Sequence, residues 1–250
     1  MNISQQQHSA DLAGLHLDHV IKIICGHEFN TPMTTILGVA EMLQEDKNDL
    51  TSKEKGEYLS FISLSGYRLN NLSKRLGIWY VLSKGRFIQK KTFDIHIAEF
   101  VQIVDDQREL FKDKNPEKIV NISSNTESIT LEGDRAYLLH AFKELINNAF
   151  KFTLLNTIVN IIFTVYNNEL VIRITNLSEM VSGYQLKEYQ VFTQFNRHKF
   201  EQQGLGVGLE IAKLGIEQCG GRFSILGKDI GGICELEASI VLPIPVNGAL

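Results

Sequence analysis

Between residues 58 and 79 the sequence carries an unbroken helical heptad pattern. The residues of this row are mostly apolar and are separated by alternating steps of four and three: Tyr58, Ile62, Ser65, Leu69, Leu72, Leu76 and Trp79. A helix places residues with this spacing on one face, as in the seam of a coiled coil. A strand would send them to opposite sides of a sheet. The pattern therefore predicts a helix that packs against other helices.

A shorter row upstream predicts a second helix. From Val20 to about Leu43 apolar residues recur at helical spacing. Four of them step by three, four and three: Met33, Ile36, Ala40 and Leu43. The polar stretch QEDKNDLTSKEKG, which begins at Gln44, predicts the connection between two antiparallel helices. Because a lone hairpin leaves its apolar rows half covered, we expect a homodimer, with a four-helix bundle formed through residues 15–84.

The pattern changes after about residue 88, which predicts a first domain at 1–88 and a second at 89–250. Helical spacing and β-branched runs alternate in the second part, so we expect an α+β protein whose sandwich has helices on one side of a largely antiparallel sheet. A hairpin turn is expected at Asn167-Asn168. The expected helices cover 97–111, 134–153 and 208–221, and the expected strands cover 118–124, 128–133, 156–168, 169–176, 222–228 and 232–243.

Composition excludes several classes of protein. The 250 residues are 44% hydrophobic and 22% charged, as in ordinary globular proteins. No window reaches the roughly 18 apolar residues of a bilayer span and no secretory signal is present, so we expect a cytoplasmic chain without a membrane segment. A net charge of -4 gives no basic field for nucleic acid. Three scattered cysteines, Cys25, Cys219 and Cys234, are expected to be buried free thiols.

The stretch HEFNTPMTTILG, which begins at His27, places reactive groups on the first helix. If Met33 belongs to the apolar row, His27 lies one step off it and faces water. A neutral imidazole there can attack a phosphoryl group, and the neighbouring Glu28 can accept the ring proton or hold the tautomer. Thr31 is one turn on and shares the face of His27. From these residues alone, an ordinary surface histidine is the alternative interpretation.

Pro32 interrupts the same stretch. It has no N–H to donate to the carbonyl oxygen of Glu28, so we expect the helix to bend there and to loosen around His27.

The second half carries a candidate site for a phosphate donor. The run GLGVGL, which begins at Gly204 and opens a helix, can offer backbone N–H groups to phosphates. In ELINNAFK, spacings of four and three place Glu144, Asn148 and Lys151 on one helical face. An amide oxygen and a lysine suit a magnesium-bound triphosphate. The alternative interpretation is the solvated face of an amphipathic helix.

Four motifs in this order resemble the boxes of one family. HEFNTPMTTILG, DRAYLLHAFKELINNAFKFT, VFTQFNR and GLGVGLEIAK look like the H, N, F and G2 boxes of sensor histidine kinases. The resemblance covers about residues 15–243 and implies a dimerisation and phosphotransfer hairpin followed by a Bergerat-type (GHKL) ATP-binding domain. It implies that His27 is phosphorylated, that Glu28 is the acid or base, and that Thr31 serves dephosphorylation of a receiver domain.

The same resemblance implies roles in binding ATP and Mg²⁺. Asn148 corresponds to the magnesium ligand and Lys151 to a phosphate contact. Arg197, just after the F box, would reach the γ-phosphate. The glycines of the lid would be Gly204, Gly206 and Gly208.

One box departs from the family pattern. These kinases carry Asp-x-Gly-x-Gly after the strand that here reads LVIRIT, and the Asp accepts a hydrogen bond from the adenine amino group. The matching residues here are Asn176, Ser178 and Met180. A neutral hydrogen bond of about 1 kcal/mol in place of a charge-assisted one of roughly 1.5–3 kcal/mol lowers affinity about tenfold or less. Met180 can fill the adenine pocket or clash with a turn that needs positive φ. We therefore expect nucleotide binding with lowered adenine affinity.

Three functions stay open on this evidence. The first is a kinase core that phosphorylates His27 from ATP and transfers the phosphoryl group to an Asp of a response regulator, whose receiver domain would dock near Met33–Leu43. The second is a phosphotransfer or interaction module that does not use ATP. The third is an ATPase in which Glu144 activates water, and the H box argues against it.

Overall fold

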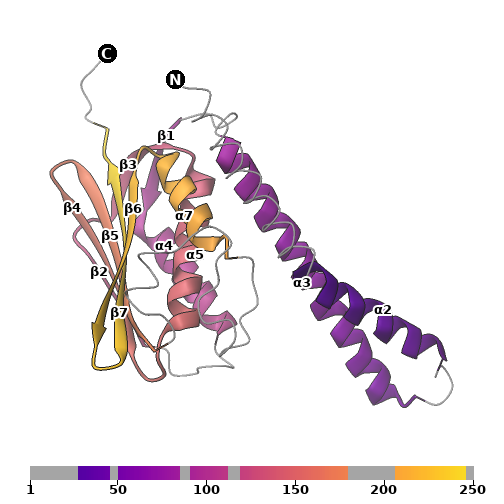
Figure 1. Ribbon diagram of the computed structural model, residues 1–250. Helices are drawn as coiled ribbons and strands as arrows, with labels where there is room; N and C mark the ends of the chain where they lie inside the picture. The colour runs from indigo at the N-terminus through magenta and orange to yellow at the C-terminus, as the bar shows by residue number, and fades with distance from the viewer. Residues whose placement is uncertain (1–27, 46–49, 85–90, 112–118, 180–205, 246–250) are drawn as a thin grey trace, which may run out of the picture. The chain divides into compact units, whose positions relative to one another are not determined.

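The computed structural model describes residues 28–45, 50–84, 91–111, 119–179 and 206–245 (Figure 1). The main division between its two compact units falls between Gly77 and Ile78. The first unit is helical and the second holds the sheet. Within the described ranges, no helix has both the length and the apolar character needed to cross a bilayer.

The helical unit contains α2 (Asn30–Glu45) and most of α3 (Ser52–Lys84). The two helices run in opposite directions on either side of their connection (Figure 1). Burial confirms the predicted row of α3, because none of its seven residues is exposed and Ser65 and Leu72 are buried. The four row residues of α2 are each half-buried. The sequence pattern therefore identified the inward faces of both helices.

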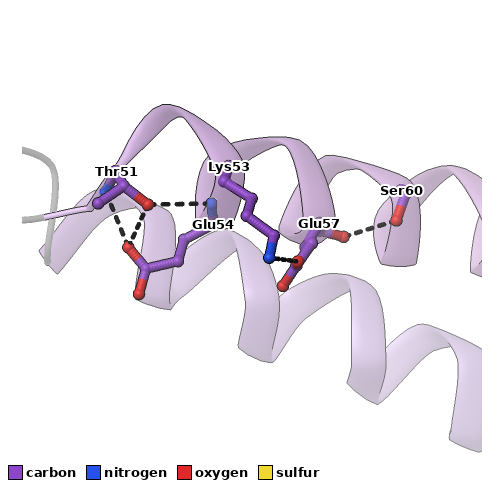
Figure 2. Close-up of polar contacts among 5 residues, drawn as sticks. All are labelled: Thr51, Lys53, Glu54, Glu57 and Ser60. Atoms are coloured by element: carbon purple, nitrogen blue, oxygen red, sulfur yellow. Dashed lines mark hydrogen bonds and ion pairs between the residues drawn. The ribbon is translucent and has the colours of Figure 1, made fainter.

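A capping box begins α3 (Figure 2). The hydroxyl and the backbone N–H of Thr51 donate hydrogen bonds to the Glu54 carboxylate at 2.7 and 2.8 Å, and the Glu54 N–H donates to the Thr51 hydroxyl at 3.3 Å. One turn on, Lys53 pairs with Glu57 at 3.9 Å, and the Ser60 hydroxyl donates to the Glu57 carbonyl at 2.7 Å. The box satisfies backbone groups that a helix start leaves unpaired, so α3 begins directly after the polar connection.

Five strands of the second unit form one sheet in the order β2-β4-β5-β7-β6. Among the described strands of this sheet, only β2 and β4 pair in parallel, which confirms the prediction of a largely antiparallel sheet. The turn between β4 and β5 has φ values of 49° at Asn167 and 57° at Asn168, and Asn tolerates this left-handed region. The strands are β2 (Ile119–Ser124), β4 (Ile158–Tyr166), β5 (Glu169–Ser178), β6 (Arg222–Ile230) and β7 (Ile233–Pro243).

A separate two-stranded sheet pairs β1 (Lys91–His96) with β3 (Ser128–Gly133) in antiparallel fashion. Strand β1 was not among the strands predicted from the sequence. Its polar residues are exposed, and only Phe93 and Ile95 are turned inward. The strand therefore depends on its pairing with β3, which lies far away in the sequence.

Helices α4 (Ile97–Leu110), α5 (Arg135–Phe152) and α7 (Gly208–Glu217) lie on one side of the large sheet, as predicted (Figure 1). Three of the buried aromatic rings in the described core between them contact one another. The centroid of Phe142 on α5 lies 4.8 Å from that of Phe100 on α4 and 6.0 Å from that of Phe163 on β4. Offset and edge contacts of this kind stabilise a core beyond the area they bury. They hold α5 firmly over the centre of the sheet.

The cysteine prediction is confirmed where the structure can address it. Cys219 and Cys234 are buried free thiols. Cys25 lies outside the described residues.

Candidate functional site

The start of α2 carries the residues of the predicted phosphotransfer stretch. His27 lies outside the described residues. Glu28 and Phe29 form a π-helical turn, and the α-helix begins at Asn30. Pro32, which is buried, stands four residues after Glu28 and offers no N–H to its carbonyl oxygen, so the wider turn is the expected local response. The winding of the helix therefore changes just before Asn30, while the bend at Pro32 and the loosening around His27 stay predictions.

Thr31 lies in the first turn of α2 with its side chain exposed. The Thr35 hydroxyl donates a hydrogen bond to the backbone carbonyl of Thr31 at 3.0 Å. That contact uses the backbone of Thr31 and not its hydroxyl. The side chain is thus accessible from solvent on the first turn after the π-helical segment.

In the second unit, the start of α5 is stabilised by an N-cap residue. The Asp134 carboxylate accepts hydrogen bonds from the backbone N–H groups of Ala136 and Tyr137 at 2.9 and 3.2 Å. The residue before it, Gly133, has a φ of 143°, and a Cβ there would lie 2.5 Å from the Cys219 Sγ. Asp134 is therefore a helix cap, and the end of β3 packs directly against the segment that follows α7.

The polar face predicted on α5 contains Glu144, Asn148 and Lys151. Glu144 is buried, and its carboxylate lies 3.7 Å from the imidazole Nε2 of His140 one turn earlier. Asn148 and Lys151 are half-buried, and the Lys151 Nζ lies 5.3 Å from the centre of the Phe152 ring. His140 was not among the predicted site residues, although its spacing of four from Glu144 places the two side chains on one helical face.

The C-terminal half of α5 is tied to the end of β5. The Leu154 N–H, two residues after the helix, donates a hydrogen bond to the Leu177 carbonyl at 2.8 Å. Phe152 packs against a buried pair on β7, Cys234 and Leu236. These contacts bring the turn of α5 that carries Asn148 and Lys151 to the same end of the sheet as the altered box.

Asn176 continues the inward row of β5. Alternate residues before it are buried in the core, and Asn176 keeps only 6% of its surface exposed. Its side-chain Nδ2 is buried and has no hydrogen-bond partner among the described residues. Ser178, the next inward residue, is fully buried. Since a buried amide without a partner is costly, Asn176 fits a site where a polar ligand supplies the missing bond.

The glycine run ends at the start of α7. Gly206 has a φ of 68°, a conformation that favours glycine, and Gly208 is the buried first residue of the helix. The residue between them, Val207, cannot accept a hydrogen bond with its side chain, so it leaves the first N–H groups of α7 to another acceptor. An anion can take that place. Arg197, Met180 and Gly204 lie outside the described residues.

In the described part of the chain, no three His, Cys, Asp or Glu side chains lie close enough together to hold a metal ion by themselves. Mg²⁺ on nucleotide phosphates commonly takes only one or two protein ligands. The amide oxygen of Asn148 is compatible with that role.

Comparison with known proteins defines the class of this fold. Residues 133–245 match the family described as histidine kinase-, DNA gyrase B- and HSP90-like ATPases. Residues 26–76, which include His27, match the His Kinase A (phospho-acceptor) domain. The second unit therefore has the fold of an ATP-binding domain, and the sandwich predicted from the sequence is confirmed. The chain thus carries the phosphoacceptor domain and, after it, the ATPase domain that make up a histidine kinase core.

Its relatives are sensor kinases from bacteria. The chain is 24% identical over 206 residues to the heme sensor protein HssS of Staphylococcus haemolyticus, covering 82% of this chain and 43% of HssS. It is 22% identical over 228 residues to the sensor protein VanS of Enterococcus faecium, covering 91% of this chain and 58% of VanS. The chain thus spans about half the length of these relatives. The structure of the histidine kinase AdeS of Acinetobacter baumannii shares the fold, with a TM-score of 0.59 and 14% identity over 88% of this chain and 98% of that one.

Proposed function

We propose that this chain transfers the γ-phosphoryl group of ATP to His27 and then passes it to an aspartate of a response-regulator receiver domain. The observation that carries the proposal is the arrangement around the end of β5. The polar face of α5 with Asn148 and Lys151, the buried amide of Asn176 and helix α7, which begins at Gly208, belong to one compact unit. A phosphate, a metal ion and a base each find a suitable group there.

The reaction at His27 needs a nucleophile and a proton acceptor. A ring nitrogen of His27 forms a bond to phosphorus while the bond between the γ-phosphorus and the bridging oxygen breaks, and ADP leaves. The ring proton passes to Glu28. In the second transfer the bond from His27 to phosphorus is replaced by one to the receiver carboxylate. Thr31 positions the water that later hydrolyses the receiver's phosphoaspartate.

The nucleotide-binding roles follow the motifs. Lys151 and Arg197 contact phosphate oxygens, and Asn148 contributes its amide oxygen to Mg²⁺. The metal ion, when bound, would neutralise phosphate charge and orient the transferred group. Gly204, Gly206 and Gly208 close over the phosphates.

Glu144 belongs to the polar face of α5 in a supporting role. Its carboxylate already lies beside the His140 ring, which favours a role in orienting that face over direct activation of water.

Association with a second copy and with a receiver domain is part of this proposal. The hairpin exposes large apolar side chains that a monomer would leave in water, and 44% to 68% of the surface of each is accessible: Phe29, Leu37, Met42, Leu59, Phe61, Leu64 and Tyr67. Such a surface favours a protein interface. The phosphotransfer domain then covers residues 1–88 and the ATP-binding domain 89–250, in the cytoplasm, and the receiver docks near Met33–Leu43.

The direct test is autophosphorylation. The purified chain is incubated with Mg²⁺ and ATP labelled in the γ-phosphate, and protein-bound label that is acid-labile and base-stable is measured. We expect label on the parent, none on His27→Ala, and undiminished label on His19→Ala, a matched change at another histidine of the N-terminal sequence.

The opposite outcome points to a different activity. If none of the three proteins is labelled, but a phosphorylated receiver domain transfers its phosphate to His27, the chain is a phosphotransfer module that does not use ATP. Equal labelling of the parent and His27→Ala would refute the assignment of His27.

A further inference from the structure

Asn176 places a polar amide in the inward-facing row of β5, where the residues before it are apolar. Only 6% of its surface is exposed, and its amide nitrogen has no partner among the described residues. Its neighbours in the inward row of β5 are Ile174, which is 1% exposed, and Ser178, which is fully buried. Directly across the ladder on β7 lies Leu236, also buried. A planar amide therefore stands at the edge of an apolar wall, a suitable setting for recognising the rim of a flat aromatic ligand.

The position of this amide relates it to the phosphate-binding groups. The hydrogen bond from Leu154 to Leu177 joins the end of α5 to the residue after Asn176. Phe152 of α5 packs on the cluster that contains Leu236. The polar turn of α5 and the Asn176 amide thus belong to the same end of the sandwich, as the base and phosphate ends of one nucleotide would require.

An amide and a carboxylate form different hydrogen bonds with a nucleotide base. An ionised carboxylate only accepts hydrogen bonds, whereas an amide has both an acceptor oxygen and a donor NH₂, and a half turn of the group exchanges them. Adenine carries an amino donor at carbon 6, and hypoxanthine and guanine carry a carbonyl acceptor at the same place. A carboxylate therefore favours adenine and opposes the carbonyl of a 6-oxopurine. The Asn176 amide can pair with either.

We infer that this chain accepts 6-oxopurine nucleotides as well as adenine nucleotides, with Asn176 as the residue that sets the selectivity. The inference rests on the proposed function insofar as the site must bind a nucleotide. It adds that the donor nitrogen of Asn176 bonds the carbonyl at carbon 6 of the base. The nucleotide class for this site is thus purine nucleotides with either substituent at that carbon.

The test uses two nucleotides that differ at carbon 6 of the base. The two nucleotides are ADP and inosine diphosphate (IDP), whose base is hypoxanthine. Their dissociation constants are measured by calorimetry with Mg²⁺ for the parent, Asn176→Asp and Asn121→Asp. The last is a matched control, since Asn121 is an exposed side chain on β2 that bonds Asn160 at 3.2 Å. For the parent and the control, we expect the two constants to agree within about tenfold. In Asn176→Asp, we expect ADP to bind more tightly and IDP more weakly, so that their ratio shifts by at least about tenfold toward ADP.

Three results would overturn the inference. If the parent prefers ADP over IDP by about a hundredfold or more, nucleotide use stands but the role given to Asn176 does not. An unchanged ratio in a folded Asn176→Asp protein leads to the same conclusion. If neither nucleotide binds the parent, the ATP step of the proposed function is lost together with the inference. The parent ratio decides the question by itself if the Asp variant does not fold.

Discussion

Gly215 of α7 lies directly against the backbone of Tyr137 on α5. A Cβ built on Gly215 would be 2.9 Å from the Tyr137 carbonyl oxygen and 3.1 Å from the Ala141 Cβ. The missing side chain therefore allows the two helices to approach closely. Both helices border the candidate nucleotide site, so their spacing sets the distance between the glycine-bounded helix start and the polar face of α5.

We predict that Gly215→Ala destabilises the second unit by about 1–3 kcal/mol, the usual result of overpacking. Urea unfolding of the full chain, followed by circular dichroism, measures this. The control is Gly56→Ala on α3, where the added methyl group meets nothing within 4 Å. Because alanine is the better helix former, the control should gain roughly 0.5–1 kcal/mol. A stabilised Gly215→Ala protein would contradict the close packing.

The capping box of α3 should make stability depend on pH. Hydrogen bonds from the Thr51 hydroxyl and backbone N–H lower the pKa of Glu54 from its ordinary value of 4.5 (Figure 2). A carboxylate whose pKa is lower in the folded state stabilises that state at pH above its unfolded pKa, and the contribution is lost as the pH falls through the folded pKa. We predict that Glu54→Gln lowers the Tm at neutral pH and that the difference from the parent shrinks as the pH is lowered through the acid range.

The expected size of the Tm change and a control variant help to interpret the Glu54→Gln experiment. The effect should be small because Glu54 is fully exposed and screened by water. The control variant is Glu57→Gln, because Glu57 and its partner Lys53 form an ion pair in which both side chains are exposed. A Tm difference between the parent and Glu54→Gln that does not change with pH would remove the capping role of the carboxylate.

The cap of α5 offers a third prediction. Asp134→Ala removes the acceptor for two backbone N–H groups and should cost about 0.5–2 kcal/mol of stability. Asp134→Asn should keep most of that stability, because asparagine caps helices about as well as aspartate. Thermal unfolding of both variants tests the cap. Equal losses for the two would indicate that the negative charge matters and the cap geometry does not.

Thr31 provides a test of the phosphatase role in the proposed function. We predict that Thr31→Ala keeps autophosphorylation of His27 but slows dephosphorylation of a receiver domain by roughly a hundredfold, since a misplaced water reacts far less often. Thr31→Ser keeps the hydroxyl and should keep the activity. Thr34→Ala, at another exposed threonine of α2, should change neither reaction. Loss of both activities in Thr31→Ala would show that the side chain supports the helix itself.

The heptad row of α3 and the polar face of α5 were predictable because both are repeats within single helices. A helical row requires only that one side of the helix be buried, and residues such as Leu72 then report it. The hairpin turn at Asn167-Asn168 was predictable for a similar reason, since the local conformation needs residues that tolerate positive φ. The resemblance to the four boxes supplied the order of the domains.

Other features depended on distant partners. β1 has few apolar residues and exists through its pairing with β3. The widened turn at Glu28 follows from Pro32, but the sequence indicated only that the helix would be disturbed there. The contact of the His140 ring with the Glu144 carboxylate could have been predicted from the spacing of four, but it was not among the predictions.

The sequence by itself determined the class of this protein, because helical periodicity, strand alternation and four ordered motifs are all properties of neighbouring residues. Only the tertiary structure decided what surrounds Asn176. Its place in β5 follows from alternation, but its burial depends on Leu236 across the ladder and on the tie between Leu154 and Leu177. Burial removes water as a partner for the amide, so the fold leaves its nitrogen without a hydrogen bond to the described residues, as the proposed nucleotide contact requires.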